Sequence, residues 1–310
     1  MTFTWARYYN LKPGMVLLLS SYINIPSHTA DIIKEMGKKF LVCTATFILF
    51  LFTGCATLPE HYVSLHDRGV LTFGEIPFTS GKDRVIFVGE GHEIITDHLL
   101  QFEIIKHLHS KGENVAIALE MFPAEMQPVL NKWIMGAISE NEFEEAYKRA
   151  WNVPYRYYAK IFEYARQARL PLVGINVNRK QIDDVARHGI DTLPGDFRKA
   201  VRVTSCAASP EYERMINLIE PRIAHVAGMP FFCDAELLRD TVMAYNIAGI
   251  FERVRFTVVA LVGSTHALRM AVPRILTQYY YVSSQILMSG AFAELLFPEP
   301  DAGLADYIWY

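Results

Sequence analysis

Short apolar runs alternate with longer segments of helical periodicity, and this alternation constrains the fold more than any other feature of the sequence. The first run, residues 85–88, is followed by apolar residues at helical spacing over 94–109. Similar runs lie at 115–119, 171–177 and 257–262, and a fifth strand is expected at 279–287. Strands separated by helices pair in parallel through right-handed crossovers. The sequence therefore predicts an α/β fold with a mostly parallel sheet flanked by helices.

Two segments fall outside this simple alternation. Residues 124–168 are rich in glutamate, lysine and aromatic residues and are too long for a simple crossover, so a smaller helical subdomain is expected there. A short edge strand is expected at 70–73, within a polar tether at 55–84. The α/β domain itself is predicted to span 85–310.

The charge of the chain argues against one class of partner. Its 310 residues are 51% hydrophobic and 20% charged, with a net charge of −3, which is a globular composition. This mild acidity, together with the lack of a basic stripe interleaved with aromatic residues, argues against a nucleic-acid partner. The function must therefore come from specific residues.

The N-terminal region has the pattern of an export signal. A short basic segment beginning at Met36 leads into an apolar run, 40–52, and then into Thr53-Gly54-Cys55. The run is shorter than the roughly 20 residues that a membrane-spanning helix needs. Residues 52–55 resemble the lipobox of bacterial lipoproteins, in which the cysteine is acylated. A plain signal peptide or an uncleaved anchor is the alternative.

The expected consequence is a lipid anchor on Cys55. A signal peptide at 36–54 would be removed, and residues 1–35 would be a non-native upstream extension. Several acyl chains anchor a protein firmly, whereas a single chain does so only marginally. Because Ala56 is not the aspartate that commonly retains lipoproteins at the inner membrane, the predicted location is the bacterial outer membrane, facing the periplasm.

Acidic and imidazole side chains follow the predicted strands at the points where the strands end. Glu90 and His92 come after the first strand, Glu120 after the second and His266 after the fourth. Because the carboxyl ends of parallel strands share one edge of the sheet, these four side chains are expected to converge. Two carboxylates and two imidazoles would suit a divalent metal ion or a general acid–base pair. A helix cap or a core histidine is the structural alternative for each residue taken alone.

Further polar residues are expected around this group. His98 and Gln101 would lie behind it on the first helix and are interpreted as supporting residues. Asp240, on the helix before the fourth strand, could orient one imidazole. Asn176 and Asn178 follow the third strand at the same edge.

Two cysteines remain in the predicted mature protein besides the lipid attachment point. Cys206 and Cys233 would lie in an oxidising compartment where a disulfide is permitted, but two buried free thiols are an equally good interpretation of their spacing. Neither belongs to a C-x-x-C pair, which excludes zinc-finger chemistry.

A series of short motifs resembles one protein family. In chain order they are Gly89-Glu90-Gly91-His92 with His98 and Gln101, Ala118-Leu119-Glu120-Met121-Phe122, Gly174-Ile175-Asn176-Val177-Asn178-Arg179, Arg239-Asp240-Thr241-Val242-Met243-Ala244 and Gly263-Ser264-Thr265-His266. Together they are similar to the ChaN family of haem-binding lipoproteins, which belongs to a superfamily with the Tiki and TraB proteins. The resemblance extends from about Gly69 to the C-terminus.

This resemblance implies a parallel α/β domain with a smaller helical one, and haem bound at the surface through a tyrosine. Tyr155, Tyr157 and Tyr158 are the candidates, because they lie in the helical insertion beside Trp151. A phenolate oxygen can ligate ferric haem, whereas amphipathic packing with the hydroxyl in water is the alternative for each tyrosine. A role in haem or iron uptake would further imply a haem receptor or transporter as a partner, and a homodimer.

Two other functions stay open at this point. The Tiki-like relatives are similar at the Gly-x-x-His motifs and are metal-dependent proteases. If Glu90, His92, Glu120 and His266 held a metal ion, one carboxylate could activate a bound water for hydrolysis. The third interpretation is a lipoprotein scaffold that keeps its polar edge only for folding. Haem binding predicts a Soret band with hemin, whereas hydrolysis predicts bound metal and loss of activity on chelation.

Overall fold

The computed structural model describes residues 57–78, 84–219, 229–251 and 255–310, which belong to one compact unit, Ala56–Tyr310. The predicted extension at 1–35, the signal peptide at 36–54 and the attachment point Cys55 lie outside the described residues. Within the described ranges, no helix is both long and apolar enough to cross a membrane.

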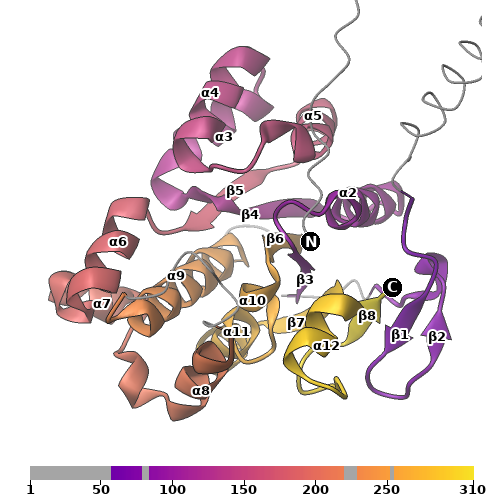
Figure 1. Ribbon diagram of the computed structural model, residues 1–310. Helices are drawn as coiled ribbons and strands as arrows, with labels where there is room; N and C mark the ends of the chain where they lie inside the picture. The colour runs from indigo at the N-terminus through magenta and orange to yellow at the C-terminus, as the bar shows by residue number, and fades with distance from the viewer. Residues whose placement is uncertain (1–56, 79–83, 220–228, 252–254) are drawn as a thin grey trace, which may run out of the picture. The chain divides into compact units, whose positions relative to one another are not determined.

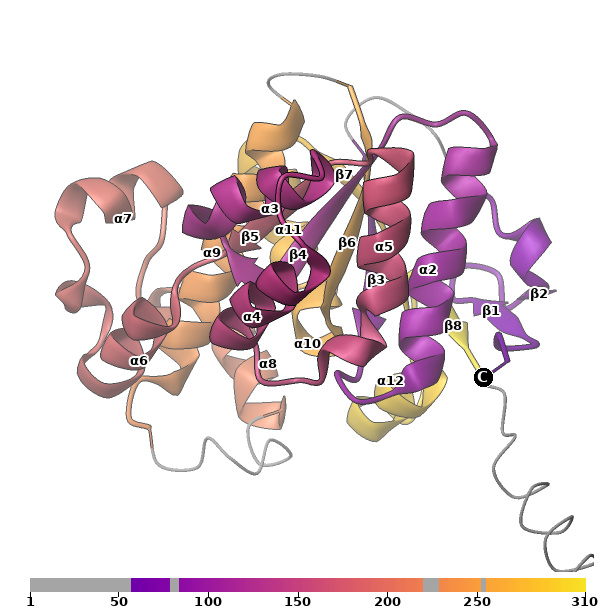
Figure 2. The ribbon, with the colours of Figure 1, turned by 90° about the horizontal axis from the view of Figure 1, so that it is seen from above.

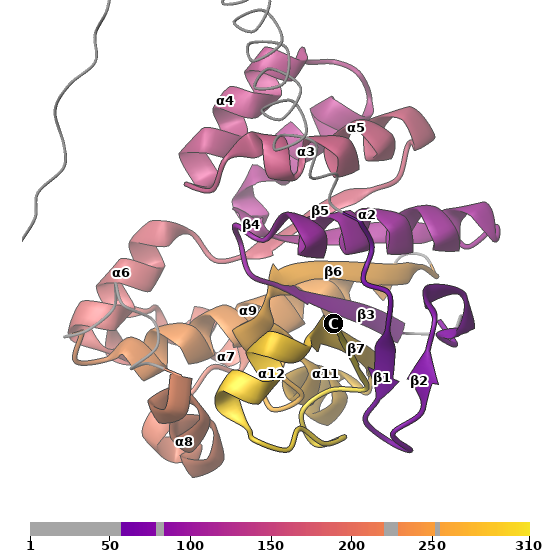
Figure 3. The ribbon, with the colours of Figure 1, turned by 45° about the vertical axis from the view of Figure 1, so that its right-hand side comes forward.

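An eight-stranded sheet with the order β2-β1-β8-β7-β3-β6-β4-β5 forms the centre of the described unit (Figures 1 and 3). The strands are β1 (Tyr62–Ser64), β2 (Val70–Leu71), β3 (Arg84–Glu90), β4 (Val115–Pro123), β5 (Leu172–Asn176), β6 (Thr257–Gly263), β7 (Ser283–Ser289) and β8 (Tyr307–Trp309). β1 pairs antiparallel with β2 and β8, and the other pairings between these strands are parallel. The predicted α/β fold with a mostly parallel sheet is confirmed.

Most predicted strands lie where the sequence placed them, and one does not. β3, β4, β5 and β6 occupy the four main apolar runs, and β2 is an edge strand as expected. The prediction of a strand beginning at Tyr279 is wrong, because Tyr279 and Tyr280 belong to a helix and β7 begins only at Ser283. That helix spans Val272–Tyr280 and buries Val272 and Leu276 in the core. Its amphipathic pattern continues through Tyr280, so Tyr279 and Tyr280 belong to its last turn.

Helices cover both faces of the sheet (Figures 2 and 3). They are α2 (Ile95–Ser110), α3 (Gln127–Ile134), α4 (Glu140–Ala150), α5 (Ala159–Ala168), α6 (Arg179–His188), α7 (Gly195–Val201), α8 (Pro210–Ile219), α9 (Phe232–Phe251), α10 (Ser264–Ala267), α11 (Val272–Tyr280) and α12 (Gly290–Leu296). α2 to α5 lie on one side, and α8, α9, α11 and α12 lie on the other (Figure 3). Because both faces are covered, the central strands bury almost every side chain, which explains their unbroken apolar sequences.

The helical insertion at 124–168 contains α3, α4, α5 and the short 3₁₀ turn η3 (Tyr155–Tyr157). Its aromatic rings pack against β4: the ring of Phe122 in β4 lies 5.8 Å from that of Phe143 and 6.1 Å from that of Phe162. The apolar side chains of this insertion are therefore continuous with the main core. A second, smaller apolar cluster lies among α6, α7 and α9.

Cys206 and Cys233 form a disulfide, with their Cα atoms 5.8 Å apart. The bond joins the 3₁₀ turn η5 (Cys206–Ala208) to the first turn of α9. The structure thus selects the disulfide from the two alternatives that the sequence left open.

Candidate functional site

Glu90 is the last residue of β3, and its buried carboxylate is surrounded by hydrogen-bond donors. Gln101 Nε2 donates to Oε2 at 2.6 Å, and the Tyr158 hydroxyl donates to Oε1 in a short hydrogen bond. His92 Nδ1 lies 2.9 Å from the same Oε1. His98 supports this arrangement, because its Nε2 donates to the backbone carbonyl of His92 at 3.0 Å. We call these residues the Glu90 cluster.

His92 carries the Glu90 cluster to the protein surface. Its side chain is 38% exposed, whereas that of Glu90 is 1% exposed. Since Nδ1 contacts the carboxylate, the hydrogen bond fixes the imidazole and leaves Nε2 for another partner. Burial lowers the pKa of His92, but the hydrogen bond to Glu90 and the charge of Glu120 outweigh it and raise that pKa above its ordinary value.

Glu120 lies within an irregularity of β4. The register between β4 and β5 shifts between Leu119 and Pro123, so β4 holds extra residues opposite β5. The bulged strand passes very close to Gly174: an added Cβ there would lie 2.8 Å from the carbonyl oxygen of Pro123. A glycine is therefore required for the bulge, and the bulge aims the Glu120 side chain at the carboxyl edge of the sheet.

The carboxylate of Glu120 is held by positive charge. Arg239 of α9 forms a short ion pair with Oε1, and the backbone N–H of Gly263 donates to Oε2 at 2.5 Å. His266 Nε2 lies 3.5 Å from Oε1. Burial raises the pKa of Glu120, but the charges of His266 and Arg239 outweigh burial and lower that pKa to about 2. Glu120 is therefore ionised at neutral pH.

His266 lies in α10, the short helix directly after β6, and is enclosed by acidic groups. Its Nδ1 is 2.6 Å from Asp240 Oδ1, and Glu236 Oε2 is 3.5 Å from its Nε2. Burial and Arg239 lower the pKa of His266, but Glu120 and Asp240 outweigh them and raise it. The Tyr212 hydroxyl donates to the second oxygen of Asp240 at 2.6 Å.

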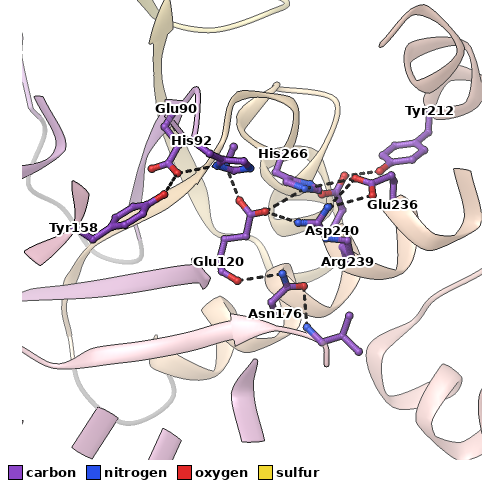
Figure 4. Close-up of polar contacts among 12 residues, drawn as sticks. Glu90, His92, Glu120, Tyr158, Asn176, Tyr212, Glu236, Arg239, Asp240 and His266 are labelled. Carbon is purple, nitrogen blue, oxygen red and sulfur yellow. Dashed lines mark hydrogen bonds and ion pairs between the residues drawn. The ribbon is translucent and has the colours of Figure 1, made fainter. Parts of the chain in front are cut away.

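We call Glu120, Glu236, Arg239, Asp240, His266 and Tyr212 the Glu120 cluster. Figure 4 shows it beside the Glu90 cluster at the carboxyl edge of the sheet. The two meet at Gly263, where an added Cβ would lie 3.3 Å from His92 Nε2 and 3.6 Å from Glu120 Oε2. The structure thus brings Glu90, His92, Glu120 and His266 to one edge, but in two groups rather than around one point.

This arrangement does not suit the divalent metal ion suggested by the sequence. Among the described residues, no group of three or more His, Cys, Asp or Glu side chains is placed to hold a metal ion. The physical reason is that the carboxylates which would ligate a metal ion are already bonded to other side chains. The Arg239 guanidinium forms ion pairs with both Glu120 and Glu236, and His266 Nε2 lies 3.5 Å from each of these carboxylates, so their oxygens already have partners within the protein. The Glu90 carboxylate already accepts from Tyr158 and Gln101.

The three candidate tyrosines differ in exposure. Tyr155 and Tyr158 are buried, and burial raises the pKa of both phenols. The nearby charge of Glu90 raises the pKa of Tyr158 further, which disfavours a phenolate there. Tyr157 is half-buried; its ring stacks on the His98 imidazole at 5.6 Å, and the guanidinium of Arg156 lies 4.9 Å from the ring centre. Only Tyr157 of the three combines solvent access with a place beside the Glu90 cluster.

The two asparagines have structural positions. Asn176 Nδ2 donates to the backbone carbonyl of Glu120 at 3.1 Å, which supports the bulge and not the carboxylate. Asn178 is the N-cap of α6, because its side chain accepts from the backbone N–H of Gln181 at 3.0 Å.

Sequence reasoning missed Glu236 and Tyr212, and it included Arg239 only within a family motif, without a role in the site. Arg239 and Asp240 follow Glu236 by three and four residues, which places both beside Glu236 on α9, and this spacing was a usable signal. Tyr212 comes from α8 and has no local pattern that would connect it to Asp240. Tyr158 was identified, but in the role of a haem ligand and not as a donor to Glu90.

A parallel sheet with acidic and imidazole side chains at its carboxyl edge defines an α/β protein with a ligand-binding edge. The family model described as "Haem-binding uptake, Tiki superfamily, ChaN" matches residues 79–276, which is more than half of the chain. The chain therefore belongs to the ChaN family of the Tiki superfamily.

One solved structure gives the same fold. A structure of ChaN of Campylobacter jejuni with cofacial haem binding is 17% identical, with a TM-score of 0.61, and the match covers 80% of this chain and 95% of that one. A mutant of the erythromycin esterase EreC in its open conformation is 14% identical, with a TM-score of 0.41 over 73% of this chain and 76% of that one. The first likeness supports the fold, and the second is too distant to carry an argument. No curated protein matches the sequence.

Proposed function

We propose that this protein binds haem on the surface beside the Glu90 cluster, as a membrane-anchored lipoprotein of haem or iron uptake. The observation that carries the proposal is a set of exposed and partly exposed apolar and aromatic side chains at the Glu90 cluster, namely His92, Ile94, Ile95, Trp151 and Tyr157, which we call the aromatic face. Ile94 and Ile95 are 51% and 55% exposed. The Trp151 ring lies edge-on to His92, with 5.1 Å between the ring centres.

The chemistry of the aromatic face fits haem. A porphyrin is a broad apolar plane, and the exposed isoleucines and partly exposed aromatic side chains offer it apolar contact. Tyr157 supplies a phenol that can ligate ferric iron as phenolate. Arg156 is exposed beside that phenol and supplies a cation for a propionate. Membership of the haem-binding ChaN family supports the same ligand.

A hemin titration with tyrosine variants tests this site. We expect a Soret band with wild-type protein, and we expect Tyr157→Phe to lower hemin affinity by about tenfold or more, because the iron loses its oxygen ligand. Tyr155→Phe is the matched control, because it removes a neighbouring phenol that is buried. Equal affinity of all these proteins would place the iron ligand outside the aromatic face.

The proposed anchor is lipid on Cys55, which would hold the protein at the bacterial outer membrane, facing the periplasm. Its support is the signal-like sequence at 36–54 followed by Cys55. Cys55→Ser should release the protein from the membrane or leave its signal uncut, as measured by fractionation and by the mass of the mature chain. Normal processing and full membrane retention of this variant would contradict the anchor.

The proposed partners are a haem receptor or transporter and a second copy of this chain. A surface site exposes one side of the haem, which a second copy could cover, and the related ChaN structure is described as binding haem cofacially. Sedimentation with and without hemin tests the dimer: the proposal expects a larger species with hemin, and an unchanged monomer would contradict it.

A further inference from the structure

A cavity of about 440 Å³ opens between α8 and α11, and α9 also contributes to its lining. We call it the basic groove. It lies on the side of the sheet opposite to α2–α5 and is therefore separate from the aromatic face (Figures 1 and 3). Its volume falls within the range of roughly 300–1,000 Å³ that is common for small-molecule sites.

Positive charge dominates the basic groove. Arg202, Arg214 and Arg274 line it, and Glu211 is the only acidic residue among its lining residues. Glu211 pairs with Arg274, but both side chains are exposed, by 55% and 43%, so this pair is screened by water and salt. Arg202 and Arg214 have no carboxylate partner among the described residues. The groove therefore carries an excess of positive charge in a chain whose net charge is negative.

Arg202 is also held in place. Its guanidinium lies over the rings of Tyr279 and Tyr280, 5.6 and 5.7 Å from their centres. Such cation–π contacts restrict the side chain while leaving its N–H groups available in the plane of the guanidinium. A guanidinium fixed in this way is suited to two parallel hydrogen bonds with a carboxylate or a phosphate.

The other lining residues indicate the chemistry of the rest of the ligand. Thr204 and Gln278 offer neutral hydrogen-bonding groups, whereas Leu237, Met270 and Ile275 give the groove an apolar wall. An inorganic ion would use the arginines and leave this wall without a partner. We infer that the basic groove binds a small organic anion, with a carboxylate or phosphate group on an apolar body.

The groove is connected to the Glu120 cluster through one side chain. Tyr212 lines the groove, and its hydroxyl donates to Asp240 at 2.6 Å. Asp240 in turn lies 2.6 Å from His266 Nδ1. A ligand that moves the Tyr212 ring would therefore change the environment of the His266 imidazole.

Calorimetric titration with phenyl phosphate and benzoate tests the inference, because these probes share an apolar ring and differ in the anionic group. Benzyl alcohol is the uncharged control. We expect at least one anionic probe to bind with one-to-one stoichiometry, and the probe that binds identifies the anionic group. Arg202→Gln should weaken that binding by about tenfold, because a charge-assisted contact is lost. Arg187→Gln, which removes an exposed arginine of α6, should change it by less than about twofold.

Several outcomes would overturn the inference. Binding of neither probe would do so, as would equal binding of benzyl alcohol. Equal loss or equal retention of affinity in Arg202→Gln and Arg187→Gln would show adventitious anion binding only.

An imidazole NMR resonance of His266 should shift when the probe binds, and Tyr212→Phe should reduce that shift. The inference is independent of haem: hemin titrations of Arg202→Gln should match wild type, so failure of the groove and failure of the aromatic face are distinguishable.

Discussion

The two carboxylates at the edge of the sheet are equally buried, yet they have opposite surroundings. Glu90 is held by the neutral donors Tyr158 and Gln101 and connects to the partly exposed His92. Glu120 is held by the guanidinium of Arg239 and connects to the buried His266. The first cluster opens onto the surface beside apolar side chains, whereas the second is closed by its own countercharges.

This difference shows which of the two carboxylate–histidine pairs is available to bind a ligand. Both signals consist of a carboxylate and a histidine near strand ends. In the Glu120 cluster, the carboxylates that a metal ion or ligand would contact are already paired with Arg239 of α9 and His266 of α10. In the Glu90 cluster, the carboxylate orients an imidazole whose Nε2 is left for another partner.

The largest effect on stability should come from removing the guanidinium of the Glu120 cluster. Arg239→Met leaves the buried Glu120 and the partly buried Glu236 without their guanidinium, which should lower the free energy of unfolding by about 3–5 kcal/mol. Urea denaturation measures this. The double variant with Glu120→Gln should recover part of the loss, because the uncompensated charge is gone. A loss below about 1 kcal/mol in the single variant would show that Arg239 does not close the cluster.

The second largest effect should come from acid, which should lower the stabilisation that ionised Glu120 gives to the fold. The folded pKa of Glu120 is lowered to about 2, below its unfolded value. Its stabilisation is therefore complete above the unfolded pKa of about 4.3 and is lost as the pH falls through that value toward 2; it amounts to about 3 kcal/mol at most. The difference in unfolding free energy between wild type and Glu120→Gln should thus shrink as the pH falls from 5 toward 2. A constant difference would contradict the ionised state of Glu120.

A smaller loss of stability is expected in the Glu90 cluster from Tyr158→Phe. This change removes a buried donor to Glu90 and should lower the free energy of unfolding by about 1–3 kcal/mol. Tyr157→Phe is the matched control, because its hydroxyl is outside the cluster, and it should change stability by less than about 0.5 kcal/mol. Similar losses in both variants would mean that the hydroxyl of Tyr158 has no special role.

The smallest stability effect is expected at His92. Its side chain is 38% exposed, so His92→Ala should cost no more than about 1 kcal/mol in thermal or chemical unfolding. The same variant should nevertheless lower hemin affinity, because the imidazole belongs to the aromatic face. A large loss of stability with unchanged hemin affinity would make His92 a structural residue.

The sequence predicted the fold better than the site, for physical reasons. β3 and β6 are buried on both faces, so their continuous apolar runs are a direct record of the sheet. The bulge in β4 depends on close contact with Gly174, which strand periodicity does not record. The division into two clusters depends on Arg239 of α9 and on Tyr158, in the turn before α5, which reach the edge only through tertiary packing. Their residue types were visible in the sequence, but their partners were not.

Hydrogen–deuterium exchange with and without hemin tests the central claim most directly, because it locates the ligand without assuming a particular iron ligand. The account predicts slower exchange on hemin binding at residues 91–98 and 151–158, which contain the aromatic face, and unchanged exchange at 232–243, which contain Glu236, Arg239 and Asp240 of the Glu120 cluster. Slower exchange confined to 232–243 and the segment around His266, with 91–98 and 151–158 unchanged, would contradict it.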